Sequence, residues 1–238
     1  MKLNELLYRG SVKDIYLGED DQTLAFKFSN RYSVFDWGEM PDQLPQKGES
    51  LAFMGELFFS YLEKADTWKN WKAPQHLKSF DLDTLKDLKV SGLKHHCLGI
   101  LEGDKTALVV KKVNVPKIPF SDGSYNYQVY NQSCENTLIP LEVIFRFGIP
   151  AGSSLLKRIG DDDYRRVLGL QHIPKEGESF SRPLIEFSTK LESTDRYIDY
   201  IEAQSIAGLN DFEFSKLFSL TMLVACRLQS FYEELGIK

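Results

Sequence analysis

Two residues of opposite charge stand four positions apart in an apolar stretch, shortly before a turn made of small residues. Glu142 and Arg146 lie within the run that ends at Phe147, and the small residues 151–154 begin four positions later. In a strand, side chains four apart point to the same face. The two residues therefore either pair with each other or hold one ligand together, and a buried pair alone is costly unless other groups complete it.

The turn after this stretch favours the second interpretation, in which Glu142 and Arg146 hold one ligand together. Gly152 allows close approach of a ligand to the backbone, and Ser153 and Ser154 add two hydroxyls to the amides of the turn. A phosphate held there would have its charge neutralised by Arg146. We therefore prefer an anion site to a purely structural Glu–Arg pair.

A second phosphate site is indicated near the N-terminus. Gly10 and Ser11 form the tip of a predicted hairpin, and Lys13 follows on the next strand. Backbone amides at such a tip can line a polyphosphate while the lysine supplies a positive charge. An ordinary hairpin is the alternative interpretation, because a glycine turn followed by lysine is common.

Two further segments collect polar side chains. The segment 30–51 is too rich in proline and glycine for regular structure, and it contains Asp36, Asp42 and Lys47. The segment 183–198 is either a functional cluster or the solvated start of a helix; its polar residues include Glu186, Thr189, Lys190, Glu192 and Asp195. The run 95–97, His-His-Cys, is not expected to bind a metal, because no further ligands stand at a paired spacing.

These residues must be positioned by an α+β chain. Two strand-like runs within residues 6–41 are separated by a polar turn at 18–22, and a helix is predicted over 49–71. Short strands follow over 80–120, with a hairpin turn at 102–104, and the tyrosine-rich segment 116–136 connects two lobes. The second lobe has a strand over 137–147, a short helix over 161–170 and a long helix that begins at Asn210 or Asp211 and ends at Gly236.

Composition excludes several classes of protein. The 238 residues are 42% hydrophobic, enough for a sizeable core, and the formal net charge is −5 with lysines interleaved among acids. We therefore expect no nucleic-acid partner, since such proteins normally carry a basic patch. We expect no membrane span either, because no stretch approaches about 20 apolar residues. Three widely separated cysteines predict the reducing cytoplasm as location.

Taken in order, four segments resemble the SAICAR synthetase (phosphoribosylaminoimidazole-succinocarboxamide synthase) family of purine biosynthesis. Residues 6–16 are similar to the family's opening hairpin, and residues 30–51 are similar to its Asp- and Pro-containing loop with Lys-Gly. Residues 138–153 are similar to its Glu–Arg strand with the Ala-Gly-Ser turn, and residues 182–198 to its Thr-Lys segment. The resemblance extends from about residue 5 to the end of the chain.

The resemblance implies an α+β fold with a kinase-like or ATP-grasp-like N-terminal lobe. An antiparallel sheet in residues 1–115 would cover ATP, and a second α+β lobe in residues 116–238 would bind a ribonucleotide and aspartate. The implied reaction is an ATP-dependent ligation of carboxyaminoimidazole ribonucleotide to L-aspartate, with ATP and Mg²⁺ as cofactors. A homo-oligomer is compatible with the sequence.

The resemblance also implies roles for individual residues. Those expected at ATP are Gly10, Ser11, Lys13, Lys111 and Lys112. Those expected at the substrates are Lys47, Glu142, Arg146, Gly152 and Ser153 or Ser154. Three catalytic candidates around the reacting carboxylates are Asp36, Lys190 and Asp195. The metal ligands are not identified.

The sequence departs from the family pattern in four places. The family has lysine where Ser11 stands, the Arg-to-Ser spacing is one residue longer, and 116–136 is an insertion relative to short members. The sequence also stops two residues after Gly236, before the family's C-terminal segment with its metal-binding carboxylates. The hypotheses are therefore a ligase, a nucleotide-binding module of the same fold without ligase activity, and a scaffold.

Overall fold

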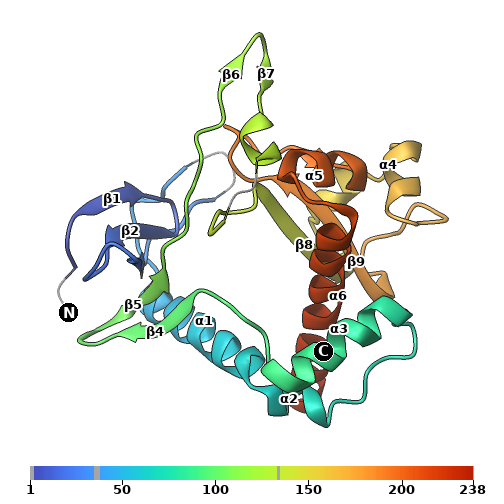
Figure 1. Ribbon diagram of the computed structural model, residues 1–238, viewed down its shortest axis with the longest axis horizontal. Coiled ribbons are helices and arrows are strands. Elements are labelled where there is room, and N and C mark those ends of the chain that lie inside the picture. The colour runs from blue at the N-terminus through green and yellow to red at the C-terminus, as the bar shows by residue number, and fades with distance from the viewer. Residues whose placement is uncertain (1–2, 35–37, 133–134, 238) are drawn as a thin grey trace. The chain divides into compact units, whose positions relative to one another are not determined.

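The computed structural model describes residues 3–34, 38–132 and 135–237, which form two compact units (Figure 1). Unit 1 comprises residues 1–70 and 88–114, and unit 2 comprises residues 71–87 and 115–238. The sequence suggested a single boundary after residue 115. In the structure, the segment 71–87 also belongs to the second unit.

Unit 1 is built on an antiparallel five-stranded sheet in the order β1-β2-β3-β5-β4. Its strands are β1 (Leu6–Arg9), β2 (Lys13–Leu17), β3 (Thr23–Phe28), β4 (Cys97–Leu101) and β5 (Asp104–Lys111). Helix α1 (Lys47–Glu63) packs on one face, where Ala52 contacts the core formed by Leu108 and Val110, and α2 (Ala65–Lys69) follows it. Lys13 is paired with Phe28, which packs in this core, so the lysine stands on the α1 face.

Unit 2 contains an antiparallel three-stranded sheet in the order β10-β9-β8 and a separate two-stranded hairpin. The strands are β6 (Phe120–Ser121), β7 (Ser124–Tyr125), β8 (Leu141–Gly148), β9 (Ser179–Thr189) and β10 (Tyr197–Ile198). The helices are α3 (Ser79–Ser91), which continues into unit 1, η2 (Gln128–Asn131), η3 (Ser154–Lys157), α4 (Asp162–Val167), α5 (Tyr200–Ala207) and α6 (Asp211–Glu234). Together, α5 and α6 cover one face of the sheet through a core around Phe187 and Ile185.

The two faces of this sheet differ in chemistry because side chains alternate along a strand. On the face covered by α5 and α6, Val143 and Phe145 of β8 pack with Phe187 of β9. On the opposite face, Glu142 is paired with Ser188 and Ile144 with Glu186. The apolar pattern of residues 141–147 therefore buries one face and leaves the charged residues on the other.

One predicted element type is wrong. Residues 79–91 form helix α3 where short strands were predicted. The buried residues Asp81, Thr84, Leu85 and Leu88 recur at helical spacing. Over so short a segment, hydrophobic periodicity does not distinguish a helix from a strand. Two of the buried residues, Asp81 and Thr84, are polar, so a pattern of apolar residues alone misses the helical spacing.

A second correction concerns residues 183–198. These residues form most of β9, then a loop and β10, and they are not the start of a helix. The predicted long helix is confirmed as α6, with Asn210 as its N-cap in a capping box with Glu213. Gly236 follows its end in the left-handed conformation (φ 71°), as expected of a residue after a helix C-terminus.

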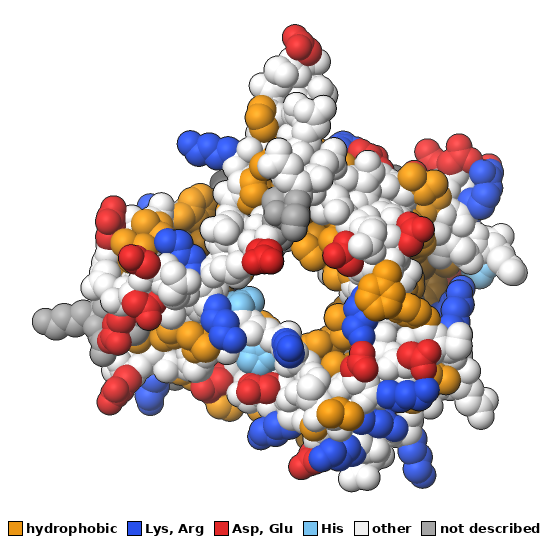
Figure 2. Space-filling model, in the orientation of Figure 1, with side chains coloured by type: hydrophobic (Ala, Val, Ile, Leu, Met, Phe, Trp, Pro, Cys, Tyr) orange, Lys and Arg blue, Asp and Glu red, His pale blue; other side chains and the backbone are white. Residues whose placement is uncertain are grey.

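Acidic and basic side chains are interspersed over the face of the molecule drawn in Figure 2. This agrees with a chain whose charges are mixed along the sequence and whose formal net charge is only −5. None of the helices in the described ranges combines the length and apolar content needed to cross a bilayer.

Candidate functional site

The polar face of the β8–β9 sheet is organised around one buried carboxylate, that of Glu186 on β9. Its side chain is fully buried, and its two oxygens contact Arg146 Nε (2.6 Å) and Arg158 Nη2 (2.8 Å). The Tyr164 hydroxyl donates to the same carboxylate at 2.6 Å. We call these four residues the Glu186 cluster.

The Glu186 cluster carries one net positive charge, since two guanidiniums share a single carboxylate. Burial alone would lower the pKa of Arg158, but its hydrogen bonds to Glu186 and Tyr164 outweigh that effect and raise the pKa. Burial, together with the hydrogen bond to Glu186, also raises the pKa of Tyr164. The tyrosine is thus a neutral donor. By formal charge, two guanidiniums and one carboxylate leave an excess positive charge that an anion can balance.

The small-residue turn lies against this cluster. Arg146 Nη1 donates to the Ser153 hydroxyl at 3.3 Å, and Arg158 Nη1 donates to the Ser154 carbonyl at 3.1 Å. Gly152 has a φ of 71°, and a Cβ there would meet nothing within 4 Å. The structure thus brings Arg146, Gly152 and Ser153 together as the sequence suggested, and the Ser153 hydroxyl is the one beside Arg146.

Glu142 and Arg146 share a face, as predicted, but they do not pair with each other. Glu142 instead forms an ion pair with Lys190, which follows the end of β9, while Arg146 pairs with Glu186. The catalytic candidate Asp195 lies exposed in the loop between β9 and β10. On this face of the β8–β9 sheet, the Glu142–Lys190 pair is therefore balanced in charge, whereas the Glu186 cluster has an excess positive charge.

In unit 1, a backbone hydrogen bond closes the tip of the hairpin that was predicted to bind phosphate. Gly10 N donates to Lys13 O (3.0 Å), and a Cβ on Gly10 would lie only 2.7 Å from that oxygen. The Val12 carbonyl accepts bonds from the backbone N–H (2.9 Å) and the hydroxyl (3.0 Å) of Ser29. Within the described ranges, the N–H groups of Ser11 and Val12 have no acceptor, so they are available to an anion.

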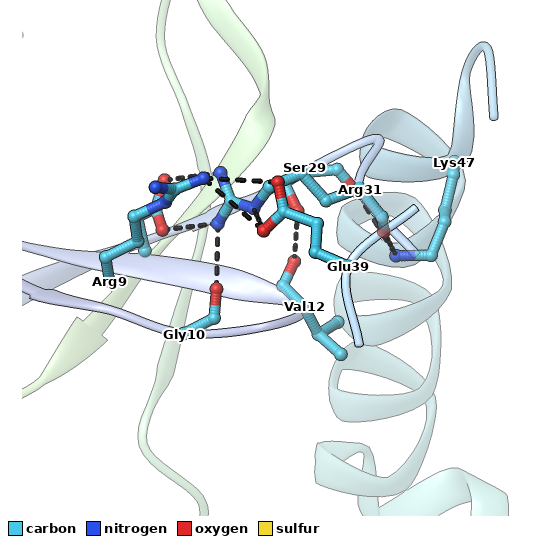
Figure 3. A network of polar contacts seen from close by, with 8 residues as sticks. Arg9, Gly10, Val12, Ser29, Arg31, Glu39 and Lys47 are labelled. Atoms are coloured by element: carbon cyan, nitrogen blue, oxygen red, sulfur yellow. Dashed lines mark hydrogen bonds and ion pairs between the residues drawn. The ribbon is translucent and has the colours of Figure 1, made fainter. Parts of the chain in front are cut away.

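Arg31 holds this hairpin from the side (Figure 3). Its Nη2 donates to Gly10 O at 2.9 Å, and its two Nη atoms contact the Asp14 carboxylate at 2.5 and 3.2 Å. The bond to Asp14 is the main cause of a raised pKa for Arg31, so this guanidinium is fully charged. Glu39, which pairs with Arg9 at 3.2 Å, completes the network.

Lys47, expected at a substrate, donates to the backbone carbonyls of Arg31 (2.8 Å) and Ser29 (3.3 Å) (Figure 3). It therefore fixes the start of the loop that follows β3. The catalytic candidate Asp36 belongs to that loop but lies outside the described residues.

The other unit 1 candidates lie along the sheet. Lys13 Nζ stands 3.8 Å from the centre of the Phe26 ring. Lys111 ends β5, with its N–H donating to His96 O, and Lys112 N donates to Gln22 O, both at 2.7 Å. Burial and the nearby Lys13 charge lower the pKa of His96, so this ring is neutral at pH 7.

The described residues do not assemble a metal site. No three histidine, cysteine or carboxylate side chains among them gather closely enough to hold an ion. His95 contacts Glu63 through Nε2 at 3.1 Å, and its Nδ1 accepts the Cys97 N–H at 3.1 Å. The described residues therefore do not fit a magnesium ion held by three protein side chains.

A family model described as SAICAR synthetase matches residues 6–238. The chain belongs to the SAICAR synthetase family. A relative from Archaeoglobus fulgidus is 37% identical over 231 residues, which cover 90% of this chain and 60% of the relative. The phosphoribosylaminoimidazole-succinocarboxamide synthase of Thermoplasma volcanium is 31% identical over 234 residues, which cover 98% and 65% of the two chains. The chain thus spans less than two thirds of the length of either relative.

Solved structures confirm the SAICAR synthetase fold. A SAICAR synthetase (Type-2) in complex with ADP is 21% identical with a TM-score of 0.59, covering 97% of this chain and 69% of that one. A structure titled SAICAR synthase is 24% identical with a TM-score of 0.58, covering 97% and 64%. The α+β class predicted for this family member, with antiparallel sheets, is therefore confirmed.

Sequence reasoning missed two of the four residues of the Glu186 cluster. Arg158 and Tyr164 were not singled out, and Glu186 was placed in a segment whose alternative was a solvated helix start. The pattern that could have revealed Glu186 is its place between Ile185 and Phe187, as a lone acid in an apolar strand. Arg158 also lies over the Tyr197 ring, 3.3 Å from its centre, a contact that sequence spacing does not indicate.

Proposed function

We propose that this chain carries the ATP-dependent ligase activity of its family. The carboxylate of carboxyaminoimidazole ribonucleotide would be joined to the amine of L-aspartate, giving SAICAR, ADP and phosphate. The observation that carries this proposal is the Glu186 cluster, which holds one net positive charge beside the Gly152–Ser153 turn. The nucleotide half of the proposal is supported by the ADP complex of a structural neighbour.

The reaction needs activation because a carboxylate is a poor acyl donor. The carboxylate oxygen would attack the γ-phosphorus of ATP, forming an acyl phosphate as the bond to the ADP oxygen breaks. The aspartate nitrogen would then attack the acyl carbon, phosphate would leave with its oxygen, and the nitrogen would lose a proton. Binding and electrostatic orientation supply most of the acceleration in such a step, and no side-chain nucleophile is required.

In this proposal, the residues of unit 2 bind the ribonucleotide. Arg146 and the Ser153 hydroxyl hold an anionic group of the substrate, and Gly152 leaves room for it. Glu186 does not touch substrate. Its buried carboxylate orients Arg146 and Arg158, one through each oxygen. Lys190 and Asp195, with Glu142, contribute polar groups near the reacting carboxylates.

The residues of unit 1 bind ATP. The free N–H groups of Ser11 and Val12 and the charge of Lys13 would receive phosphates, with Gly10 permitting the tight tip. Lys111 and Lys112 would lie near the adenine, and Asp36 would act near the reacting carboxylates. Magnesium would accompany ATP as part of the substrate. The cytoplasm is the proposed location, in keeping with free buried thiols at Cys97 and Cys226.

Calorimetric titration tests the assignment of Arg146. Carboxyaminoimidazole ribonucleotide is expected to bind the chain, and Arg146→Ala should weaken that binding about 10- to 100-fold, the value of a charged hydrogen bond or two. ATP affinity should stay the same. Arg166→Ala is the matched control, since this exposed arginine pairs only with Asp163 on its own helix among the described contacts. Equal losses in both variants would refute the site.

The same titration distinguishes the alternatives. ATP binding without ribonucleotide binding would indicate a nucleotide-binding module, and absence of both would indicate a scaffold.

A further inference from the structure

The segment 120–131, which follows unit 1 in the chain, is anchored firmly on unit 2 before it reaches β8. It includes the β6–β7 hairpin, drawn as a projecting arm in Figure 1, and η2. Tyr130 is buried, and its hydroxyl donates to Leu138 O at 3.0 Å. A Cβ on Gly208 would lie only 1.9 Å from Tyr130 O, so η2 rests directly on the end of α5.

Two tyrosine hydroxyls of this anchored segment reach the loop that joins β9 to β10. Tyr127 OH donates to Glu192 Oε1 at 2.8 Å, and Tyr125 OH accepts the Ser193 N–H at 2.9 Å. One contact fixes a side chain of the loop, and the other fixes its backbone. Because the buried ring of Tyr130 and the packing of η2 against Gly208 hold the segment, these contacts tie the loop to the body of unit 2.

Glu192 is the centre of this attachment. Its side chain is only 7% exposed, and Arg196 donates to it through Nη2 (3.1 Å) and Nε (3.3 Å). Burial would raise the pKa of Glu192, but the hydrogen bonds from Arg196 and Tyr127 outweigh this effect and lower it. Glu192 is therefore ionised and turned inward, although its neighbours Ser193 and Asp195 are exposed.

The ends of the loop are also closed by hydrogen bonds. Thr189 N donates to Arg196 O at 3.0 Å, and Arg196 N donates to the Thr189 hydroxyl at 3.1 Å. Between these ends stand Lys190, paired with Glu142, and the exposed Asp195. Two candidate residues of the site thus lie on a loop whose middle is held by the tyrosines of a distant segment.

We propose that Tyr125 and Tyr127 are positioning residues that hold the 190–196 loop in its binding conformation. The proposal rests on the proposed function, because the loop has a binding role only if the chain binds the ribonucleotide. Ordering a free loop residue costs about 1–2 kcal/mol of conformational entropy for the backbone alone. A loop that is already fixed when substrate arrives does not incur that cost during binding. The tyrosine segment would therefore strengthen substrate binding without touching substrate.

The test compares Tyr127→Phe and the double variant Tyr125→Phe/Tyr127→Phe with Tyr130→Phe. Tyr130→Phe is the matched control, because it keeps the buried ring that anchors the segment and removes a hydroxyl that donates to Leu138 O. Amide hydrogen exchange should become about tenfold faster or more in residues 190–196 of the double variant, because two hydrogen bonds of about 0.5–1.5 kcal/mol each are lost. It should stay unchanged there in Tyr130→Phe. Unchanged loop exchange in the double variant would overturn the proposal.

Titration with carboxyaminoimidazole ribonucleotide then tests the positioning role. Affinity should fall about five- to tenfold in the double variant, while ATP affinity and melting temperature stay near those of the parent chain. A ribonucleotide affinity equal to that of the parent would overturn the role, as would a parallel loss of ATP affinity. If the parent chain binds no ribonucleotide, the proposed function fails and the positioning role with it; hydrogen exchange still decides whether the tyrosines hold the loop.

Discussion

The replacement Glu186→Gln tests the central feature of unit 2. The carboxylate is fully buried and is the shared partner of Arg146 and Arg158. Glutamine keeps one acceptor oxygen but removes the charge, which leaves two partly buried guanidiniums without their counter-charge. Breaking a buried ion pair from one side costs about 3–5 kcal/mol. Because an acceptor remains, we expect a loss of unfolding free energy near the lower end, about 3 kcal/mol.

Glu142→Gln provides the matched control. It makes the same chemical change on the same sheet face, two residues along β8 from Ile144, the strand partner of Glu186. Its partner Lys190, however, is 47% exposed, and Glu142 itself is 32% exposed. Exposed pairs contribute about 0.2–1 kcal/mol. For a chain of this size, 1 kcal/mol corresponds to about 2–4 °C in melting temperature. Glu186→Gln should therefore melt about 6–12 °C below the parent chain, and Glu142→Gln at most about 4 °C below it.

Added anion should separate the two variants further. Inorganic phosphate at ten times its dissociation constant stabilises a folded protein by about 1.4 kcal/mol. We expect phosphate to raise the melting temperature of Glu186→Gln more than that of the parent, because the uncompensated arginines bind it more tightly. Thermal melts with and without phosphate, at constant ionic strength, measure both effects. If Glu186→Gln melts no lower than Glu142→Gln, Glu186 is not the counter-charge of the site.

Three further predictions concern other parts of the molecule. Gly10→Ala should weaken ATP binding, because its Cβ would stand 2.7 Å from Lys13 O; calorimetric ATP affinity equal to that of the parent would contradict this hairpin geometry. Arg31→Ala should weaken ATP binding about tenfold by releasing Gly10 and Asp14, whereas Arg9→Ala, a change of a 61%-exposed side chain, should have little effect; equal affinities in both variants would argue against this role. The lowered pKa of Glu192 means that the folded state binds fewer protons there than the unfolded chain, so its stabilisation is full above the ordinary glutamate pKa of about 4.3 and is lost as pH falls through the lower folded value. Melting temperatures between pH 6 and pH 3 should therefore decline less steeply in Glu192→Gln, and an identical slope would refute the assignment.

Much of the fold was predictable because local patterns agree with tertiary packing. The apolar run over residues 137–147 predicted a strand, and β8 occupies Leu141–Gly148 with Val143 and Phe145 on the α5 and α6 face. The two N-cap candidates, Asn210 and Asp211, and the final Gly236 predicted the ends of α6, and Asn210 is the N-cap. Helix α3 was missed because its buried face includes Asp81, whose carboxylate accepts bonds from Lys78 N (2.9 Å) and the Ser219 hydroxyl (2.5 Å). Asp81 can be buried because Ser219, which is distant in sequence, donates to it. The periodicity of the sequence does not show such a distant partner.

The candidate site was predictable in part for a similar reason. Arg146 and Ser153 are close in sequence, and their contact follows from one strand and one turn. Glu186 and Arg158 come from separate elements, and their contact depends on the register of β8 against β9 and on the path of residues 149–168. Lys47 likewise carries a family motif, yet its nearest partners are backbone carbonyls. Motif position identified these residues, but only the fold shows which groups they contact.

The most direct measurement is ADP release by this 238-residue chain supplied with ATP, magnesium and carboxyaminoimidazole ribonucleotide, with and without L-aspartate. The proposed ligase predicts ADP release that depends on aspartate and that falls sharply in Arg146→Ala but not in Arg166→Ala. ADP release that is absent, or that is the same without aspartate, would contradict the ligase activity of this chain.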